Sequence, residues 1–194
     1  MPNVKGNWRA IVCVLALLVS SSFSQNQADG SSNWKSVFQS RLPLYGHRNW
    51  IVVADSAFPV YAAPGIETIA VNEDLPSVLK YVAGAVASSR HIRATVFLDR
   101  ELQFIDEHDY PGVSGLRRDI LSTFSRDQIS SIPHADVMSR VEEAGKTFRI
   151  LFIKTTSTIP YTSVFMRLDC GYMNDEVERK IRTAMEAANQ RQTK

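Results

Sequence analysis

The chain has 194 residues, of which 44% are hydrophobic and 22% charged, a composition typical of a globular domain and not of a disordered protein. Lys5 and Arg9 are the only charged residues of the first 24, so the remaining chain carries 20 basic and 20 acidic residues. This balance, with no basic stripe interleaved with aromatic residues, gives no support to nucleic-acid binding.

The first 24 residues have the pattern of a cleavable secretory signal. Lys5 and Arg9 precede an apolar run of ten residues, Ala10 to Val19, and small residues follow up to Ser24. Ten apolar residues are too few to cross a bilayer, which takes about 20. We therefore expect residues 1–24 to be a signal peptide, with an uncleaved anchor as the alternative. The protein would then be exported, periplasmic or secreted, without stable membrane insertion after cleavage.

The rest of the chain is expected to contain a polar linker and one domain. Residues 25–33 (QNQADGSSN) are predicted to be the linker, and residues 34–190 the domain. Cys170 is the only cysteine outside the signal, which excludes an intrachain disulfide framework and a cysteine-based zinc site.

The first half of the domain alternates between helical and strand patterns. Apolar residues at helical spacing predict a helix over 34–42, which Pro43 ends. A continuous apolar run predicts a strand at 51–54, and further strands are predicted at 66–71 and 95–98. Between the last two, Asp74 can cap a helix that has Pro76 in its first turn.

The second half continues this alternation. After a turn-rich loop at 106–115, Leu116, Ile120, Leu121 and Phe124 predict a helix. A strand is expected at 129–132, a helix from Pro133-His134 to about Ala144, and strands at 148–153 and 163–168.

Asn174 can cap a last helix whose apolar face is Val177, Ile181 and Met185, and the tail from residue 190 is predicted to be solvated. Strands alternating with helices indicate a three-layer α/β/α domain with a mixed or parallel central sheet. In such sheets the polar side chains at strand ends tend to form the site.

Two of the four histidines stand where a strand or helix begins. His47 precedes the strand at 51–54, and His134 opens a helix. His91, beside two arginines, is expected to be a solvated surface residue. His108 lies among Asp106, Glu107 and Asp109, but a charge-rich turn usually needs no ion, so we predict no metal site.

Several familiar catalytic motifs are missing from the sequence. It contains no G-x-S-x-G, no phosphate-binding glycine loop, no H-E-x-x-H and no G-x-G-x-x-G. The remaining acid/base and hydrogen-bonding groups are His47, Asp55, His134, Tyr161 and Ser163. Their composition alone does not identify them as a site, because residues in such positions are more often structural than catalytic.

Four segments, taken together, resemble the ribose pyranase and fucose mutarotase family (RbsD/FucU). "GHRNWIVVADSAFP" (46–59) resembles its Gly-His pair followed by a strand that ends in Asp-Ala-x-x-Pro. "GIETIAVNEDLPSVLKYVAGAV", "IPHADVM" and "FIKTTSTIPYTSVFM" follow in the family's order. The resemblance spans about residues 36–172 and implies the RbsD-like fold.

The resemblance also implies a function. Family members interconvert ring forms or anomers of free monosaccharides by acid/base catalysis without a cofactor, and they form ring-like homo-oligomers, commonly decamers. Residue by residue, it implies catalytic roles for His47, Asp55 and His134. It implies sugar binding by Tyr161, Ser163 and Lys154. Asp55 would bind sugar hydroxyls or orient His47.

The sequence departs from the family pattern at three places near these residues. Asn49 replaces an aspartate, Ser163 replaces the turn asparagine, and Thr156-Ser157 replaces a Gly-Glu pair. Two alternatives stay open: a noncatalytic sugar-binding or structural protein of the same fold, and an unrelated hydrolase using Ser56.

The spacing of His47 and Asp55 makes a geometric prediction. Eight residues in a straight strand span about 26 Å at about 3.3 Å per residue. Either the segment before Trp50 turns back toward Asp55, or the two residues serve adjacent sites across a subunit contact.

Overall fold

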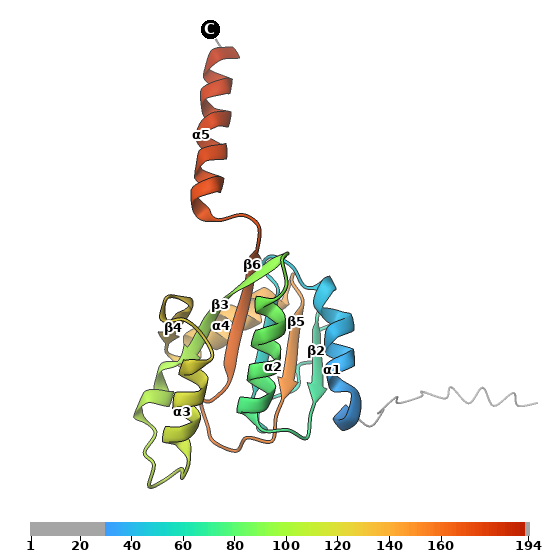
Figure 1. Ribbon diagram of the computed structural model, residues 1–194, viewed down its shortest axis with the longest axis vertical. Coiled ribbons are helices and arrows are strands. Elements are labelled where there is room, and N and C mark those ends of the chain that lie inside the picture. Colours follow the sequence, from blue (N-terminus) through green and yellow to red (C-terminus); the bar gives the residue numbers. More distant parts are fainter. Residues whose placement is uncertain (1–29, 193–194) are drawn as a thin grey trace, which may run out of the picture.

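A central sheet of six strands organises the computed structural model, which describes residues 30–192 (Figure 1). The strand order is β2-β5-β1-β6-β3-β4. The strands are β1 (Trp50–Ala54), β2 (Ile66–Ala70), β3 (Ile92–Asp99), β4 (Ile129–Ile132), β5 (Ile150–Lys154) and β6 (Val164–Cys170). The helices are α1 (Gly30–Arg41), α2 (Leu75–Ala87), α3 (Val113–Ser122), α4 (His134–Gly145) and α5 (Asp175–Gln192). Short 3-10 turns are η1 (Leu42–Leu44), η2 (Arg100–Phe104) and η3 (Arg126–Gln128).

The sheet is mixed because β6 runs against its neighbours. β1 and β2 are parallel to β5, β3 is parallel to β4, and β6 is antiparallel to both β1 and β3. Five strands therefore end where β6 begins. We call this the carboxyl end of the sheet, and the end where β6 finishes the amino end.

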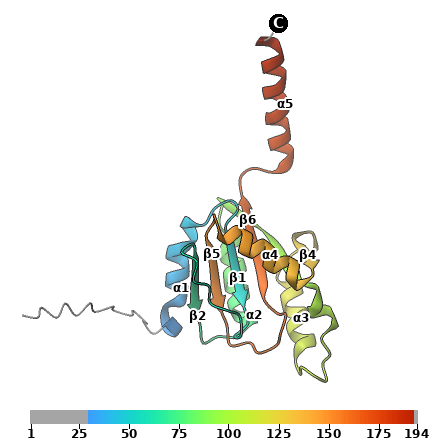
Figure 2. The same cartoon turned by 180° about the vertical axis from the view of Figure 1, so that it is seen from behind.

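Helices cover both faces of the sheet, which confirms the predicted three-layer α/β/α class. Helices α1, α2 and α3 pack on one face, where Trp34 and Phe38 of α1 join the larger apolar core. Helix α4 crosses the other face (Figure 2), where Val137 and Val141 pack against Val52 and the aromatic side chains of β5 and β6.

The predicted element boundaries are mostly confirmed, with differences set by tertiary pairing. The Asp74 carboxylate accepts a hydrogen bond from the Ser77 backbone N–H at 2.8 Å, as expected of an N-cap. Strand β3 begins three residues earlier than predicted because Ile92 to Ala94 pair with the end of β6. Helix α1 begins at Gly30, inside the predicted linker, and α3 ends before Phe124.

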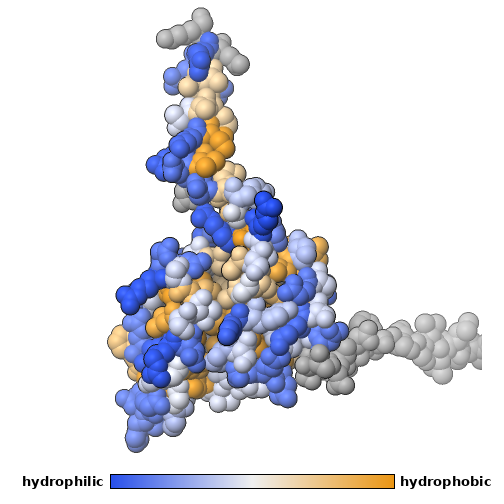
Figure 3. Space-filling view, viewed as in Figure 1, coloured by the Kyte–Doolittle hydropathy of each residue, from blue (hydrophilic) through white to orange (hydrophobic). Residues whose placement is uncertain are grey.

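Helix α5 projects away from the sheet and its covering helices (Figure 1). Its predicted apolar stripe is present but exposed: Val177, Ile181 and Met185 are 43%, 49% and 59% exposed, and Figure 3 shows the apolar surface on the shaft of the helix. The helix runs to Gln192, through part of the predicted tail. Among residues 30–192, no helix combines the length and apolarity needed to span a membrane. The predicted signal peptide lies outside the described residues.

Candidate functional site

Most of the predicted site residues gather at the carboxyl end of the sheet. Asp55 follows β1, Lys154 is the last residue of β5, and Ser163 comes directly before β6. His134 begins α4, and Tyr161 lies in the loop between β5 and β6. These residues lie close together because the carboxyl ends of parallel strands lie at the same edge of the sheet.

His134 is held by the buried carboxylate of Asp99, the last residue of β3. Its Nδ1 lies 2.9 Å from Oδ2 of Asp99, a residue that is only 1% exposed. The His134 backbone N–H, at the start of α4, donates to both carboxylate oxygens of Glu101 at 3.1 and 3.0 Å. The imidazole side chain remains 38% exposed. One ring nitrogen is therefore fixed and the other side of the ring faces outward.

The environment of Asp99 opposes its ionisation. Burial raises the pKa of Asp99 from 3.8 to about 6, and the nearby carboxylates of Glu101 and Asp55 push in the same direction. The hydrogen bond and charge of His134 lower it in part. Oδ1 of Asp99 is buried with no hydrogen-bond partner. An ionised Asp99 carboxylate can only accept, so Nδ1 of His134 is the donor in this contact, and in the neutral imidazole Nε2 is then the acceptor.

The Asp55 carboxylate is fixed by Ser163. The Ser163 hydroxyl donates to Oδ2 of Asp55 at 2.8 Å and accepts from the Asp55 backbone N–H at 3.1 Å. Oδ1 accepts from the Ala57 backbone N–H at 3.0 Å. Ser163 is 2% exposed, so its contacts position Asp55 and leave little surface for a ligand.

Tyr161 and Lys154 border the same cluster. The Tyr161 ring meets the His134 ring edge-on, with centroids 5.4 Å apart. Its backbone has φ of 57°, a left-handed conformation that is uncommon for an aromatic residue and is found enriched at functional sites. Lys154 follows Phe152 by two residues, so strand alternation places its side chain on the face covered by α4.

His47 lies at the amino end of the sheet, away from the other predicted site residues. Its Nδ1 is 3.6 Å from Oδ1 of Asp169, at the end of β6, and its side chain is 61% exposed. The segment before Trp50 does not turn back: the Arg48 backbone N–H donates to the Leu168 carbonyl at 2.7 Å. The expectation that Asp55 orients His47 is therefore wrong within one chain, because β1 separates the two residues.

The other two histidines have no place in this cluster. His91 is half-buried, with Nε2 3.2 Å from the Tyr45 carbonyl oxygen, so the prediction of a solvated residue is wrong. His108 is 94% exposed beside Asp109. Within residues 30–192, no group of three or more His, Cys, Asp or Glu side chains is arranged to hold a metal ion.

Sequence reasoning missed Asp99 and Glu101. Asp99 directly follows the apolar run Val96 to Leu98, the same pattern that drew attention to Asp55 after its strand. That pattern could have predicted Asp99 as a site residue. Its pairing with His134, however, depends on β3 and β4 lying side by side.

A family model, described as the RbsD / FucU transport protein family, matches residues 38–189. The chain belongs to this family. The match spans both ends of the sheet, and with it the RbsD/FucU resemblance of the sequence is confirmed. A comparison with curated proteins found no match.

Solved structures agree with the RbsD/FucU fold. RbsD of Bacillus subtilis complexed with D-ribose is 17% identical, covering 69% of this chain and 92% of that one with a TM-score of 0.50. The fucose mutarotase of Streptococcus pneumoniae in complex with L-fucose is 16% identical, with coverages of 69% and 91% and a TM-score of 0.47. FucU of Bifidobacterium longum is 15% identical, with coverages of 69% and 94% and a TM-score of 0.45. At such low identity the likeness to RbsD shows the fold alone.

Proposed function

We propose that this protein is a monosaccharide mutarotase or pyranase-like isomerase that works by acid/base catalysis without a cofactor. The observation that carries the proposal is the His134–Asp99 pair at the carboxyl end of the sheet. Family membership supports it, since the structurally similar RbsD was solved with D-ribose. A hydrogen-bonded, partly exposed imidazole is suited to the proton transfers of such a reaction.

The reaction needs two proton transfers at one sugar ring. A base removes the proton of the anomeric hydroxyl, an acid protonates the ring oxygen, and the bond between the anomeric carbon and the ring oxygen breaks to give the open-chain carbonyl form. Reclosure on either face, with the two groups in exchanged roles, gives the other anomer; attack by a different hydroxyl gives the other ring size. Nε2 of His134 would serve as one of these groups, because Nδ1 is engaged by Asp99.

The neighbours of His134 suit a polyhydroxylated ligand. Asp55 keeps lone pairs free on both carboxylate oxygens after its contacts with Ser163 and Ala57, and it can accept from sugar hydroxyls. The Tyr161 hydroxyl and the Lys154 ammonium are donors for ring or exocyclic oxygens. Their number and variety match the binding of a sugar better than that of an apolar substrate.

The second proton-transfer group is proposed to be His47 of a neighbouring copy. Within one chain, His47 lies at the amino end of the sheet, exposed and only loosely paired with Asp169. A homo-oligomer that sets the amino end of one copy against the carboxyl end of the next would unite the two histidines. The predicted ring assembly and the predicted export of the protein are part of this proposal.

Anomer exchange measured by saturation-transfer NMR tests the proposal. D-ribose, L-fucose and a panel of other free sugars are compared with buffer, using wild type and His134→Asn, with the exposed His108→Asn as the matched control. We expect acceleration by wild type and His108→Asn, and a loss of at least about 100-fold in His134→Asn. Sugar binding without exchange would establish the noncatalytic alternative, and exchange insensitive to His134→Asn would refute the assigned site.

A further inference from the structure

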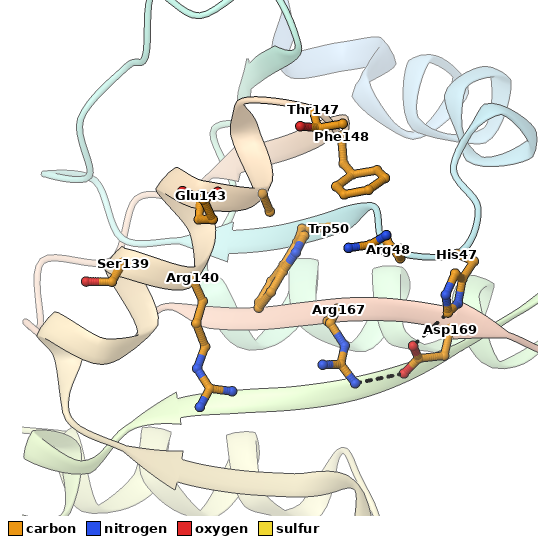
Figure 4. A pocket seen from close by; sticks show the side chains of 11 residues that line it. His47, Arg48, Trp50, Ser139, Arg140, Glu143, Thr147, Phe148, Arg167 and Asp169 are labelled. Atoms are coloured by element: carbon orange, nitrogen blue, oxygen red, sulfur yellow. Dashed lines mark hydrogen bonds and ion pairs between the residues drawn. The ribbon is translucent and has the colours of Figure 1, made fainter. Parts of the chain in front are cut away.

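A cleft at the amino end of the sheet contains arginines that the proposed reaction does not use. It lies between α4 and the strands β1 and β6, with a volume of about 690 Å³, within the range of about 300–1,000 Å³ typical of small-ligand sites. Arg48, Arg140 and Arg167 come to it from the turn before β1, from α4 and from β6, and Figure 4 shows them around Trp50.

Two of these guanidinium groups have no carboxylate partner in the part of the chain that the structure describes. Arg48 lies over the Phe148 ring, 4.5 Å from its centroid, and Arg140 lies over the Phe97 ring at 5.2 Å. Neither forms an ion pair with any carboxylate of residues 30–192. Stacking on an aromatic face orients a guanidinium and leaves the N–H groups along its rim available.

The two carboxylates that line the cleft are already engaged. Oδ2 of Asp169 accepts from the Thr95 hydroxyl at 3.0 Å and pairs with Arg167 at 3.3 Å. Glu143 pairs with Lys146, three residues further along the chain, just after the end of α4. The donors in the cleft therefore exceed the acceptors that its own chain supplies.

The backbone at Arg48 is held in an unusual conformation. Arg48 has φ of 72°, in the left-handed region that residues with a side chain rarely adopt. Its N–H donates to the Leu168 carbonyl, and the Asn49 N–H donates to the Gly46 carbonyl, which fixes the turn. This conformation directs the Arg48 side chain over Phe148 and into the cleft (Figure 4).

We propose that the cleft binds the anionic group of a small ligand, a carboxylate or a phosphate. Planar guanidinium groups recognise both anions through paired N–H donors. Resting on the proposed function, this inference also names the substrate class. His47 lines the same cleft, so a sugar brought to His47 lies beside these arginines. The substrate is then an acidic monosaccharide, either a uronic acid or a sugar phosphate.

Calorimetric titration at low salt tests the anion site separately from catalysis. The probes are D-glucuronate and D-galacturonate against D-glucose and D-galactose, D-glucose 6-phosphate against D-glucose, and inorganic phosphate alone. We expect the anionic member of at least one pair to bind at least about tenfold more tightly than its neutral partner. The carboxylate and phosphate arms decide which anion the cleft takes.

Arginine variants test whether the anion binds in this cleft. Arg140 is exposed on α4, so Arg140→Met should fold normally, and we expect it to weaken anion binding about tenfold or more. Arg140→Lys keeps the charge without the planar fork and should weaken binding by less. Arg126→Met, in η3 outside the cleft, should leave binding unchanged.

The inference is overturned if no anionic probe binds, or if wild type, Arg140→Met and Arg126→Met bind equally. It also fails if Arg140→Met changes the oligomeric mass but leaves anion binding unchanged, because Arg140 would then serve the contact between copies and not a ligand. If wild type binds an anion, Arg140→Met loses that binding, and wild type exchanges no anomers, the anion site is upheld and the mutarotase is refuted. If wild type exchanges the anomers of neutral sugars but binds no anion, the mutarotase is upheld and the anion site is refuted.

Discussion

At the carboxyl end of the sheet, His134 is paired with the buried carboxylate of Asp99, whereas at the amino end His47 is exposed and two arginines form no ion pair within residues 30–192. Asp99 is 1% exposed and holds His134, but His47 is 61% exposed and lies 3.6 Å from Asp169. The first arrangement fixes a tautomer, and the second leaves N–H donors for a ligand. Within one chain, His134 and His47 lie at opposite ends of the sheet and cannot act on one sugar.

Helix α4 connects these two ends. It begins with His134 at the carboxyl end and carries Arg140 toward the amino end on the same face of the sheet. The two regions are thus built on one rigid element, and the difference between them comes from what surrounds it. A pair of complementary ends favours head-to-tail contact between copies.

The largest expected effect comes from mixing two variants, each of which lacks the histidine of one end of the sheet. His47→Ala and His134→Ala should each lose about 10²- to 10⁴-fold in anomer exchange, because each removes one proton-transfer group. When the two are co-assembled, some sites combine an intact His134 with an intact His47 from the neighbouring copy. We expect saturation-transfer NMR to detect exchange far above either variant alone. A co-assembled mixture that stays inactive would show that no site is shared between copies.

The burial of Asp99 predicts a pH-dependent cost to stability. Its pKa is raised in the folded state, from 3.8 to about 6, so the folded protein binds this proton more tightly than the unfolded chain. This tighter proton binding stabilises the folded protein. Its contribution to the free energy of unfolding is complete below pH 3.8 and is lost as the pH rises through about 6. Asp99→Asn removes this dependence. Relative to wild type, the variant should therefore gain about 2 kcal/mol between about pH 4.5 and 7.5.

Urea unfolding of both proteins across this range measures the difference. The exposed Asp109→Asn is the control and should follow wild type. If the difference between Asp99→Asn and wild type does not change with pH, the carboxylate is not the buried, poorly solvated group of this structure.

The smallest expected effect concerns the charge of the cleft. Glu143→Gln removes one carboxylate from its lining, so an anionic probe should bind about twofold more tightly at low salt. The control is Glu186→Gln on α5, away from the cleft. Calorimetry that finds weaker binding in Glu143→Gln would mean that the carboxylate itself contacts the ligand.

The sequence alone predicted the elements with strong local signals. The strand at 51–54 is continuously apolar and is fully buried in the structure, and Asp74 and Pro76 marked the start of α2. The strand at 129–132 and the helix beginning at His134 were found at nearly their observed bounds. These predictions succeeded because each rests on the hydrophobicity or capping of a short segment.

Predictions that depend on residues distant in the sequence were less complete. Asp55, His134 and Tyr161 were chosen from a resemblance, but Asp99 was overlooked, since its contact with His134 joins residues 35 apart. The arginine cleft gave no sequence signal at all: Arg48, Arg140 and Arg167 come from three separate elements.

The sequence by itself determined that strands alternate with helices, that polar residues end the strands, and that His47 and Asp55 stand eight residues apart. Only the tertiary structure decided that His47 remains at the amino end while Asp55, Asp99 and His134 share the carboxyl end. The reason is physical: hydrophobic periodicity fixes which residues are buried, but the order and direction of strands depend on pairing between distant segments. The antiparallel strand β6, placed between β1 and β3, links Ser163 to Asp55 at one end and Asp169 to His47 at the other.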